Sequence, residues 1–401
     1  MPLGWIDFSK NDKDKVLNVI SLLEEKGTLD ELGIANIRDG FSNKFFPGTS
    51  TIQTRAKYFL IVPYTLKDLT RSGITDPKKM IEVLNETEKE CAKILKDKGN
   101  ANDGIIGFRT LDQGKWLRRT PSDIYWSGLK TYGILNYDFS IAEYIQSVCE
   151  DNRVLKSNER HISERTRTDG ENDDLDAGLQ YKEPYWNLPL TYKYEEWKKN
   201  LEINLTKDEA KFLKDLIINN RRESVRESMI AQILKENIEG ILDIDSFSSL
   251  DDQLIKHFSL EIQDLFSLAK NFSAFIYVLK ILYNKIISNN NNEEANNEWK
   301  RIEPELKERA NIDLDKIYKI LNITNGNLKL FLNKEKELLL NKNYEEMKIE
   351  ITKRETQIKP GDRAKTLHPC SDYKWYGGKE LDYRFNKAKN ILNDIFKSLN
   401  K

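Results

Sequence analysis

The chain has 401 residues, of which 39% are hydrophobic and 32% are charged, and its 64 basic and 65 acidic residues give a formal net charge of −1. This composition excludes a disordered chain and is typical of a folded protein of two or three domains. Because so small a mean charge attracts no polyanion, any contact with nucleic acid must come from local basic patches.

Cysteine use and the apolar runs predict where the protein resides. Cys91, Cys149 and Cys370 are odd in number and far apart, which favours a reducing compartment over a disulfide framework. The first residues lack the basic start and apolar centre of a signal peptide. The apolar run at 58–64 is far shorter than the roughly 20 residues of a membrane helix. We therefore expect a cytoplasmic protein.

The predicted fold class is mainly α with small β elements. Helices are expected near 11–26, 29–44 and 50–62, and a short strand near 104–111 follows them, so the N-terminal region could be winged-helix-like. A second strand is expected at 347–352. The segment 260–287 is apolar on nearly all sides, which predicts a long buried helix.

Several helices are predicted to begin at capping boxes, in which a hydroxyl and an acid three residues later satisfy free N–H groups. The pattern occurs at Ser140, Thr206, Ser224 and Ser249, and Thr120 precedes a proline and an acid in a similar way. These signals and the composition divide the chain into an aromatic-rich helical domain at 1–150, a polar linker at 151–185, a helical domain at 186–345 and a mixed basic and aromatic segment at 346–401.

The stretch FFPGTSTIQTRAKYFLIVPY, residues 45–64, is a candidate anion site. If a helix begins at 48–51, its free N–H groups and the hydroxyls of Thr49, Ser50 and Thr51 could hold a phosphate, with Arg55 and Lys57 close by. The alternative is that the hydroxyls only cap a helix whose apolar residues face the core. Capping is the favoured interpretation, and anion binding stays open.

A second basic and aromatic block occupies residues 107–135. Cations interleaved with flat rings suit contact with phosphates and stacking on bases, although the rings could equally form a core seam. The residues predicted to bind nucleic acid, from this block and the preceding stretch, are Arg55, Lys57, Arg109, Lys115, Trp116, Arg118, Arg119 and Trp126.

The sequence has no recognisable catalytic or metal-binding signature. The three histidines are far apart, and the closest Cys–His pair, His368 and Cys370, is a weak zinc signal. No nucleophile elbow and no phosphate-binding P-loop occurs. We therefore predict no catalytic residue, metal or cofactor.

Three segments resemble a known family. GWIDFS (4–9), DELGIANIRDGFSNKFFPGTSTIQTRAKYFLIVPY (30–64) and RTPSDIYWSGLKTYGI (119–134) are similar to an uncharacterised bacterial family, domain of unknown function 6361. The tail YGGKELDYRFNKAKNILNDI (376–395) is similar to the way that family ends. Its members are commonly encoded beside helicase-like and phospholipase-D-like nuclease proteins in antiphage defence clusters. The resemblance implies a role beside DNA-processing enzymes and assigns no catalytic residue.

Three functional hypotheses follow. The first is an accessory, non-enzymatic component of a bacterial antiphage system that binds nucleic acid, with DNA favoured, or a helicase or nuclease partner, without a membrane role. The second is a metal-dependent nuclease or other hydrolase whose acids meet only in the fold. The third is a structural adaptor that makes no nucleic-acid contact.

Overall fold

The protein is described here from a computed structural model. The structure describes residues 30–100, 103–113, 116–165, 184–194, 196–250, 252–359, 361–378 and 380–400. The helix expected at 11–26 and the candidate Lys115 lie outside these residues.

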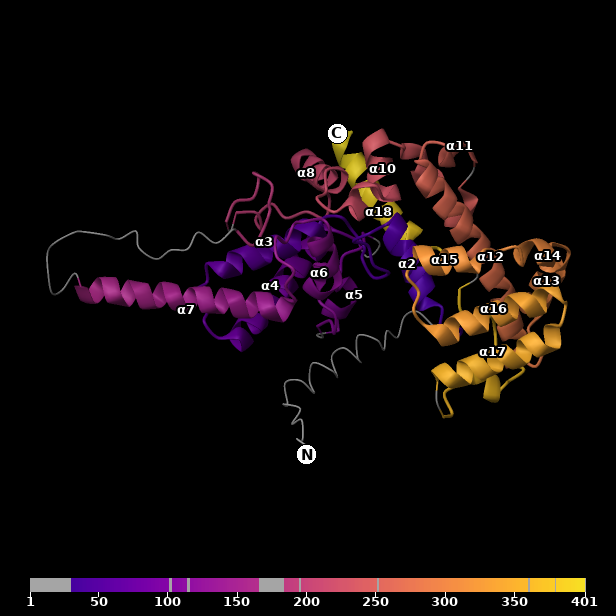
Figure 1. The fold of residues 1–401 in the computed structure, drawn as a ribbon. Coiled ribbons are helices and arrows are strands. Elements are labelled where there is room, and N and C mark those ends of the chain that lie inside the picture. Colours follow the sequence, from indigo (N-terminus) through magenta and orange to yellow (C-terminus); the bar gives the residue numbers. More distant parts are fainter. Residues whose placement is uncertain are drawn as a thin grey trace, which may run out of the picture. The chain divides into compact units, whose positions relative to one another are not determined.

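The described chain is mainly α-helical, as predicted (Figure 1). Among the described residues the only β feature is an isolated antiparallel bridge between Leu135 and Trp186. Both predicted strands are wrong. Gly104 and Gly107 have positive φ values of 75° and 87°, which break an extended strand before a short helix. The segment 347–352 lies inside a helix.

The chain divides into two compact units, each of which collects distant segments. Unit 1 consists of Met1–Arg38 and Ser267–Leu381, and unit 2 of Asp39–Phe266 and Asp382–Lys401. The domain limits at 150, 185 and 345 stay predictions.

Unit 2 is built around α3 (Tyr58–Thr70), which has buried side chains at every position from Tyr58 to Leu66. The helix α3 packs on α4 and α6, and α8 packs on α10 and α18. The helices that lie wholly in this unit are α3, α4 (Pro77–Lys98), α5 (Phe108–Leu111), α6 (Pro121–Thr131), α7 (Ile141–Arg165), α8 (Lys207–Ile218), α9 (Glu223–Arg226), α10 (Met229–Glu236), η1 (Glu239–Asp243), η2 (Phe247–Ser249), α11 (Asp252–Ile255) and α18 (Phe385–Leu399).

Unit 1 centres on the second part of α12 (Leu260–Ile287), which has the bounds expected from the sequence. This helix is long and apolar enough to cross a membrane, but 72% of its most apolar window is buried, as in the core helix of a soluble protein. The cytoplasmic location stays a prediction. The other helices of this unit are α13 (Glu293–Ile302), η3 (Glu303–Glu305), α14 (Leu306–Arg309), α15 (Leu314–Ile320), α16 (Gly326–Leu340), α17 (Tyr344–Ile358) and η4 (Lys365–Leu367), and α2 (Ala35–Phe45) begins here.

In unit 1, side chains of α12 form hydrogen bonds with the backbone of the segment that contains Tyr376 and Leu381. The buried Asn284 donates to the carbonyl of Tyr376 at 3.1 Å and accepts from the N–H of Tyr376 at 2.7 Å. Ser273 accepts from the N–H of Leu381 at 2.9 Å. These bonds give the irregular backbone at Tyr376 and Leu381 partners that it cannot provide for itself.

The observed helix starts confirm some of the predicted capping boxes and contradict others. Thr120 and Thr206 form complete capping boxes, and Ser140 exchanges bonds with Glu143 in the same way. The predicted start at Ser224 is wrong, because α9 begins at Glu223 and α10 follows Ser228. The predicted start at 48–51 is also wrong, because α3 begins at Tyr58.

Candidate nucleic-acid interface

The corner before α3 is a tight turn held together by its own side chains. Gly48 has a φ of +78°, and a Cβ there would lie 2.8 Å from the ring of Tyr132, so both conformation and space require glycine. The hydroxyl of Thr49 donates to the carbonyl of Phe46 at 2.6 Å. Gln53 accepts from the N–H of Ser50 at 3.1 Å and donates to the carbonyl of Gly48 at 3.1 Å.

This turn changes the basis of the predicted anion site. No helix begins at 48–51, so the dipole and free N–H groups on which the prediction depended are missing there. Thr49 is buried, whereas Ser50 and Thr51 are half-buried, and the buried hydroxyl of Ser50 has no partner among the described residues. Anion binding by these three residues stays a prediction without support from a helix terminus.

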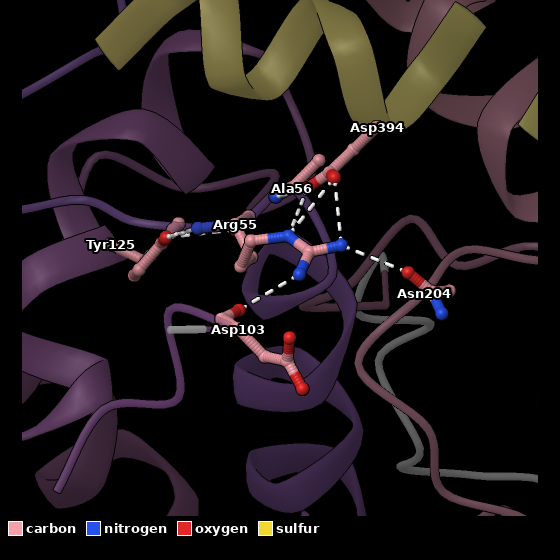
Figure 2. A network of polar contacts seen from close by, with 6 residues as sticks. All are labelled: Arg55, Ala56, Asp103, Tyr125, Asn204 and Asp394. Atoms are coloured by element: carbon pink, nitrogen blue, oxygen red, sulfur yellow. Dashed lines mark hydrogen bonds and ion pairs between the residues drawn. The ribbon is translucent and has the colours of Figure 1, made fainter. Parts of the chain in front are cut away.

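Arg55 is the centre of a polar network that joins four segments of unit 2 (Figure 2). Its Nε donates to both carboxylate oxygens of Asp394 at 2.9 Å, and Nη2 lies 2.9 Å from Oδ1 of the same residue. Nη1 donates to the carbonyl of Asp103 at 2.8 Å, and Nη2 donates to Asn204 at 2.9 Å. Asp394 also accepts from the N–H of Ala56 at 2.8 Å. All the guanidinium nitrogens are therefore bonded within the protein.

Tyr125 holds the backbone beside Arg55. Its hydroxyl accepts from the N–H groups of Thr54 at 2.9 Å and Arg55 at 3.1 Å and donates to the carbonyl of Arg55 at 2.8 Å. One donated and two accepted bonds use the full capacity of a phenol. Burial raises the pKa of Tyr125 well above its ordinary value, so the ring stays neutral.

Lys57 forms a buried ion pair with Glu209. Its Nζ lies 2.6 and 2.8 Å from the two carboxylate oxygens, and both residues are buried. The same carboxylate accepts from the N–H of Thr206 at 2.8 Å in the capping box of α8. The charges of Arg55 and Lys57 are thus neutralised by internal carboxylates, which favours a structural role for both.

Trp126 is likewise engaged inside the unit. It is 7% exposed, and its Nε1 donates to the carbonyl of Phe139 at 2.7 Å. Its ring meets the rings of Tyr144 and Trp186 edge to face, with centroids 5.8 and 6.0 Å away. These contacts favour the core-seam alternative for this residue.

Three of the predicted residues are at least partly exposed in α5 and in the segment that follows it, and we call them together the α5 surface: Arg109, Trp116 and Arg118. Arg109 and Arg118 are exposed, and Trp116 is half-buried. A Cβ at Gly107 would lie 3.0 Å from the Trp116 ring, so the ring lies against the turn that precedes Arg109. Trp116 Nε1 is buried and has no acceptor within the described residues. Arg119 is half-buried and makes contacts of its own.

The acid that is nearest to Arg109 in the sequence pairs with another cation. Asp112 pairs with Lys96, whose ammonium also lies 5.1 Å from the centre of the Phe108 ring. Within the described chain, no carboxylate forms an ion pair with Arg109 or Arg118. The α5 surface therefore combines two exposed cations and one aromatic ring.

Buried titratable groups nearby have structural partners. Glu88 accepts from the N–H of Ser122 at 2.7 Å in the first turn of α6, and burial raises its pKa to about 7. Burial raises the pKa of Cys91 to about 12, which keeps its thiol protonated at neutral pH. The described part of the chain has no group of three or more His, Cys, Asp or Glu side chains that could hold a metal ion.

The comparisons with known proteins add one finding. Residues 1–161 match the model of a family described as "Family of unknown function (DUF6361)". The resemblance noted in the sequence is thus supported over this segment. No curated protein matches the chain, and no solved structure matches it.

Local sequence patterns do not reveal which residues bind the candidate residues Arg55 and Lys57. Tyr125, Glu209 and Asp394 determine what Arg55 and Lys57 do, and the sequence predicts none of these contacts. Their separations from the cations are 70, 152 and 339 residues along the chain. The capping box at Thr206 was a visible signal for Glu209, but nothing local indicated that its carboxylate would also bind a lysine.

Proposed function

We propose that the protein is a non-enzymatic accessory component of a bacterial antiphage defence system, which contacts nucleic acid through the α5 surface. The observation that carries the proposal is that Arg109 and Arg118 are exposed, with the half-buried Trp116 between them in the chain, and that neither has a carboxylate partner among the described residues. Exposed cations gain free energy from phosphates by releasing counterions, and a partly exposed ring can stack on a base.

The family resemblance supports the same role. Relatives encoded beside helicase-like and nuclease-like proteins would work where DNA is unwound or cut, and a nucleic-acid contact is useful there. DNA is the favoured ligand, and a helicase or nuclease is the favoured protein partner. The winged-helix-like arrangement of the N-terminal region stays a prediction that lacks its expected strand.

The decisive experiment is fluorescence anisotropy with labelled single- and double-stranded DNA at two salt concentrations. We expect salt-sensitive binding, and we expect Arg109→Ala with Arg118→Ala to weaken it and to reduce the slope of log K against log salt by about 2. Trp116→Ala should weaken single-strand binding more than double-strand binding, because stacking needs an unpaired base.

The matched control removes two exposed lysines elsewhere in unit 2. Lys211→Ala with Lys235→Ala changes the net charge by the same amount on α8 and α10. If this control weakens binding as much as the arginine pair does, the contact is a general charge effect and the α5 surface is not the site. Absence of binding by the unaltered protein at low salt would reject nucleic acid as the ligand.

A structural adaptor is the second candidate, because of apolar exposure on α7. Val154 is 57% exposed and Leu155 is 50% exposed, in a stretch where residues 153–158 all have exposed side chains. An exposed apolar pair on a helix suits a protein partner. Co-purification with the neighbouring helicase, which Val154→Ser with Leu155→Ser should abolish, would support this role, and retention of the partner by that variant would reject it.

A further inference from the structure

A groove of about 320 Å³ lies along the helical hairpin of α16 and α17 in unit 1. The two helices are joined by the short turn 341–343 and pack against each other. The lining residues recur at helical spacing on both helices, so each helix contributes one face. The polar side chains of this lining are Asn327, Lys334, Glu350, Lys353, Arg354 and Gln357.

Arg354 is the unusual member of this lining, because it is buried and forms no ion pair with a carboxylate of the described residues. The residue is 6% exposed. Its Nε donates to the carbonyl of Leu32 at 3.0 Å, and Nη2 donates to the carbonyl of Gly33 at 3.3 Å. Its guanidinium carbon lies 5.6 Å from the centre of the Phe331 ring. Among the described residues, Nη1 has no acceptor and no acid forms an ion pair with the guanidinium.

A buried cation that forms no ion pair is costly, because carbonyl dipoles replace only part of its hydration. Burial lowers the pKa of Arg354 from its ordinary value, and the negative charge of Asp30 opposes this shift only in part. An anion bound in the groove would supply the ion pair that Arg354 lacks. Arg354 resembles in this respect the arginines that bind oxyanions with one edge of the guanidinium while the other edge is held by the protein.

The remaining charges of the groove are positive on balance. Lys353 forms a 2.6 Å pair with Glu350, three residues earlier on α17. Lys334 is partly exposed and lies 3.5 Å from Glu337, which is outside the lining. Three cations and one carboxylate therefore give the lining a net charge of +2.

Glu335, next to Lys334 on α16, does not offset this charge. It is fully buried, and neither carboxylate oxygen has a partner in the described chain. Burial raises its pKa to about 9, so the carboxyl is protonated and neutral at pH 7.

We propose that this groove binds a small phosphate monoester, with Arg354, Lys334 and Lys353 holding the phosphate. A phosphate monoester carries close to two negative charges at neutral pH, which matches the net charge of the lining better than a carboxylate does. Leu330 lines the groove and is 71% exposed, so it offers an apolar surface to the organic part of the ligand. The side-chain amides of Asn327 and Gln357 lie at the other end of the two helical faces and can bond to its polar groups. The site is independent of the α5 surface.

The test is isothermal titration of the full-length protein with four probes: inorganic phosphate, glycerol 3-phosphate, adenosine monophosphate and acetate. We expect saturable binding of the three phosphates, with both monoesters tighter than inorganic phosphate, and no measurable binding of acetate. Tighter binding of the nucleotide than of glycerol 3-phosphate, lost in Asn327→Ala with Gln357→Ala, would identify a nucleotide as the ligand. Equal affinity for the two would identify the phosphate group as what is recognised.

Substitution of the exposed lysines tests the site without the risk of unfolding that Arg354 carries. Lys334→Gln and Lys353→Gln should each weaken phosphate binding about tenfold, because each substitution removes a charged hydrogen bond from the lysine to the phosphate. Lys348→Gln is the matched control, because Lys348 also pairs with a glutamate three residues earlier on α17 but does not line the groove. No saturable binding of any phosphate, equal binding of acetate, or an equal loss in the control would overturn the proposal.

Discussion

Arg55 is a cation whose hydrogen bonds all remain inside the protein, in contrast to the exposed Arg109. We expect Arg55→Met to lower the free energy of unfolding by about 3–5 kcal/mol, because it leaves Asp394 buried without its partner. Arg109→Met removes the same charge from the surface and should change stability by less than about 0.5 kcal/mol. Denaturant unfolding monitored by circular dichroism measures both. Equal, small effects would show that the network does not stabilise the unit.

Glu335 makes the stability of the protein depend on pH. Its pKa is near 4.5 when unfolded and about 9 when folded, so the folded state holds one more proton between these values. Stability should therefore fall as pH rises from about 5 to 9. Glu335→Gln removes the contribution of this group to the pH dependence and should raise stability at pH 7 by up to about 3 kcal/mol. Denaturation midpoints of the unaltered protein and of Glu335→Gln, measured across this pH range, test the prediction. Glu337→Gln, which is exposed on the same helix, should leave the slope intact, and an unchanged slope in Glu335→Gln would contradict the assignment.

At the scale of elements, local signals in the sequence predict helices well where the partners are three or four residues apart. The capping boxes at Thr120 and Thr206 hold because both partners lie in one turn. The segment MKIEIT looks like a strand because its apolar residues alternate. In the helix, however, Met347 and Ile351 are buried one turn apart, and Ile349 is 48% exposed.

The bounds of α3, which runs from Tyr58 to Thr70 and not over 50–62, could not be predicted in the same way. Pro63 favours an end or kink at that residue, yet it lies inside the helix, and tertiary burial of every side chain from Tyr58 to Leu66 overrides the local cost. The candidate site was predictable only in part for a similar reason. The exposure of Arg109 and the burial of Arg55 depend on residues that are far away in the sequence, and composition cannot separate the two.

The two serine and threonine patterns in unit 2 give a direct test at this scale. Thr206→Ala should cost about 1 kcal/mol of stability, because it removes the cap of α8. Ser224→Ala should cost less than about 0.5 kcal/mol, because Ser224 is exposed and caps no helix in the described chain. Thermal unfolding of the two variants measures the difference. A larger loss in Ser224→Ala would mean that α9 begins differently from the structure.

At the scale of the whole molecule, the segment that matches the family does not contain all the partners it needs. Residues 39–161 of this segment lie in unit 2 together with 162–266 and 382–401. Lys57 pairs with Glu209 on α8, and Arg55 pairs with Asp394 on α18. The cations of the segment 46–57 therefore depend on two carboxylates from outside the matched segment.

An isolated fragment of residues 1–161 should therefore fail to unfold cooperatively on heating, whereas the full chain should unfold with a sharp transition. The fragment keeps α3, α4 and α6 but leaves the buried Lys57 without its counter-ion, at a cost of about 3–5 kcal/mol. Circular dichroism melts of both, at equal concentration, measure the difference.

In the full chain, Glu209→Gln with Asp394→Asn keeps every helix and removes only the two charges. If that variant loses most of the stability, the ion pairs are what the fragment lacks; if it stays stable while the fragment does not, the apolar cover from α8 and α18 is decisive. A fragment that melts as sharply as the full chain would show that residues 1–161 form a domain by themselves.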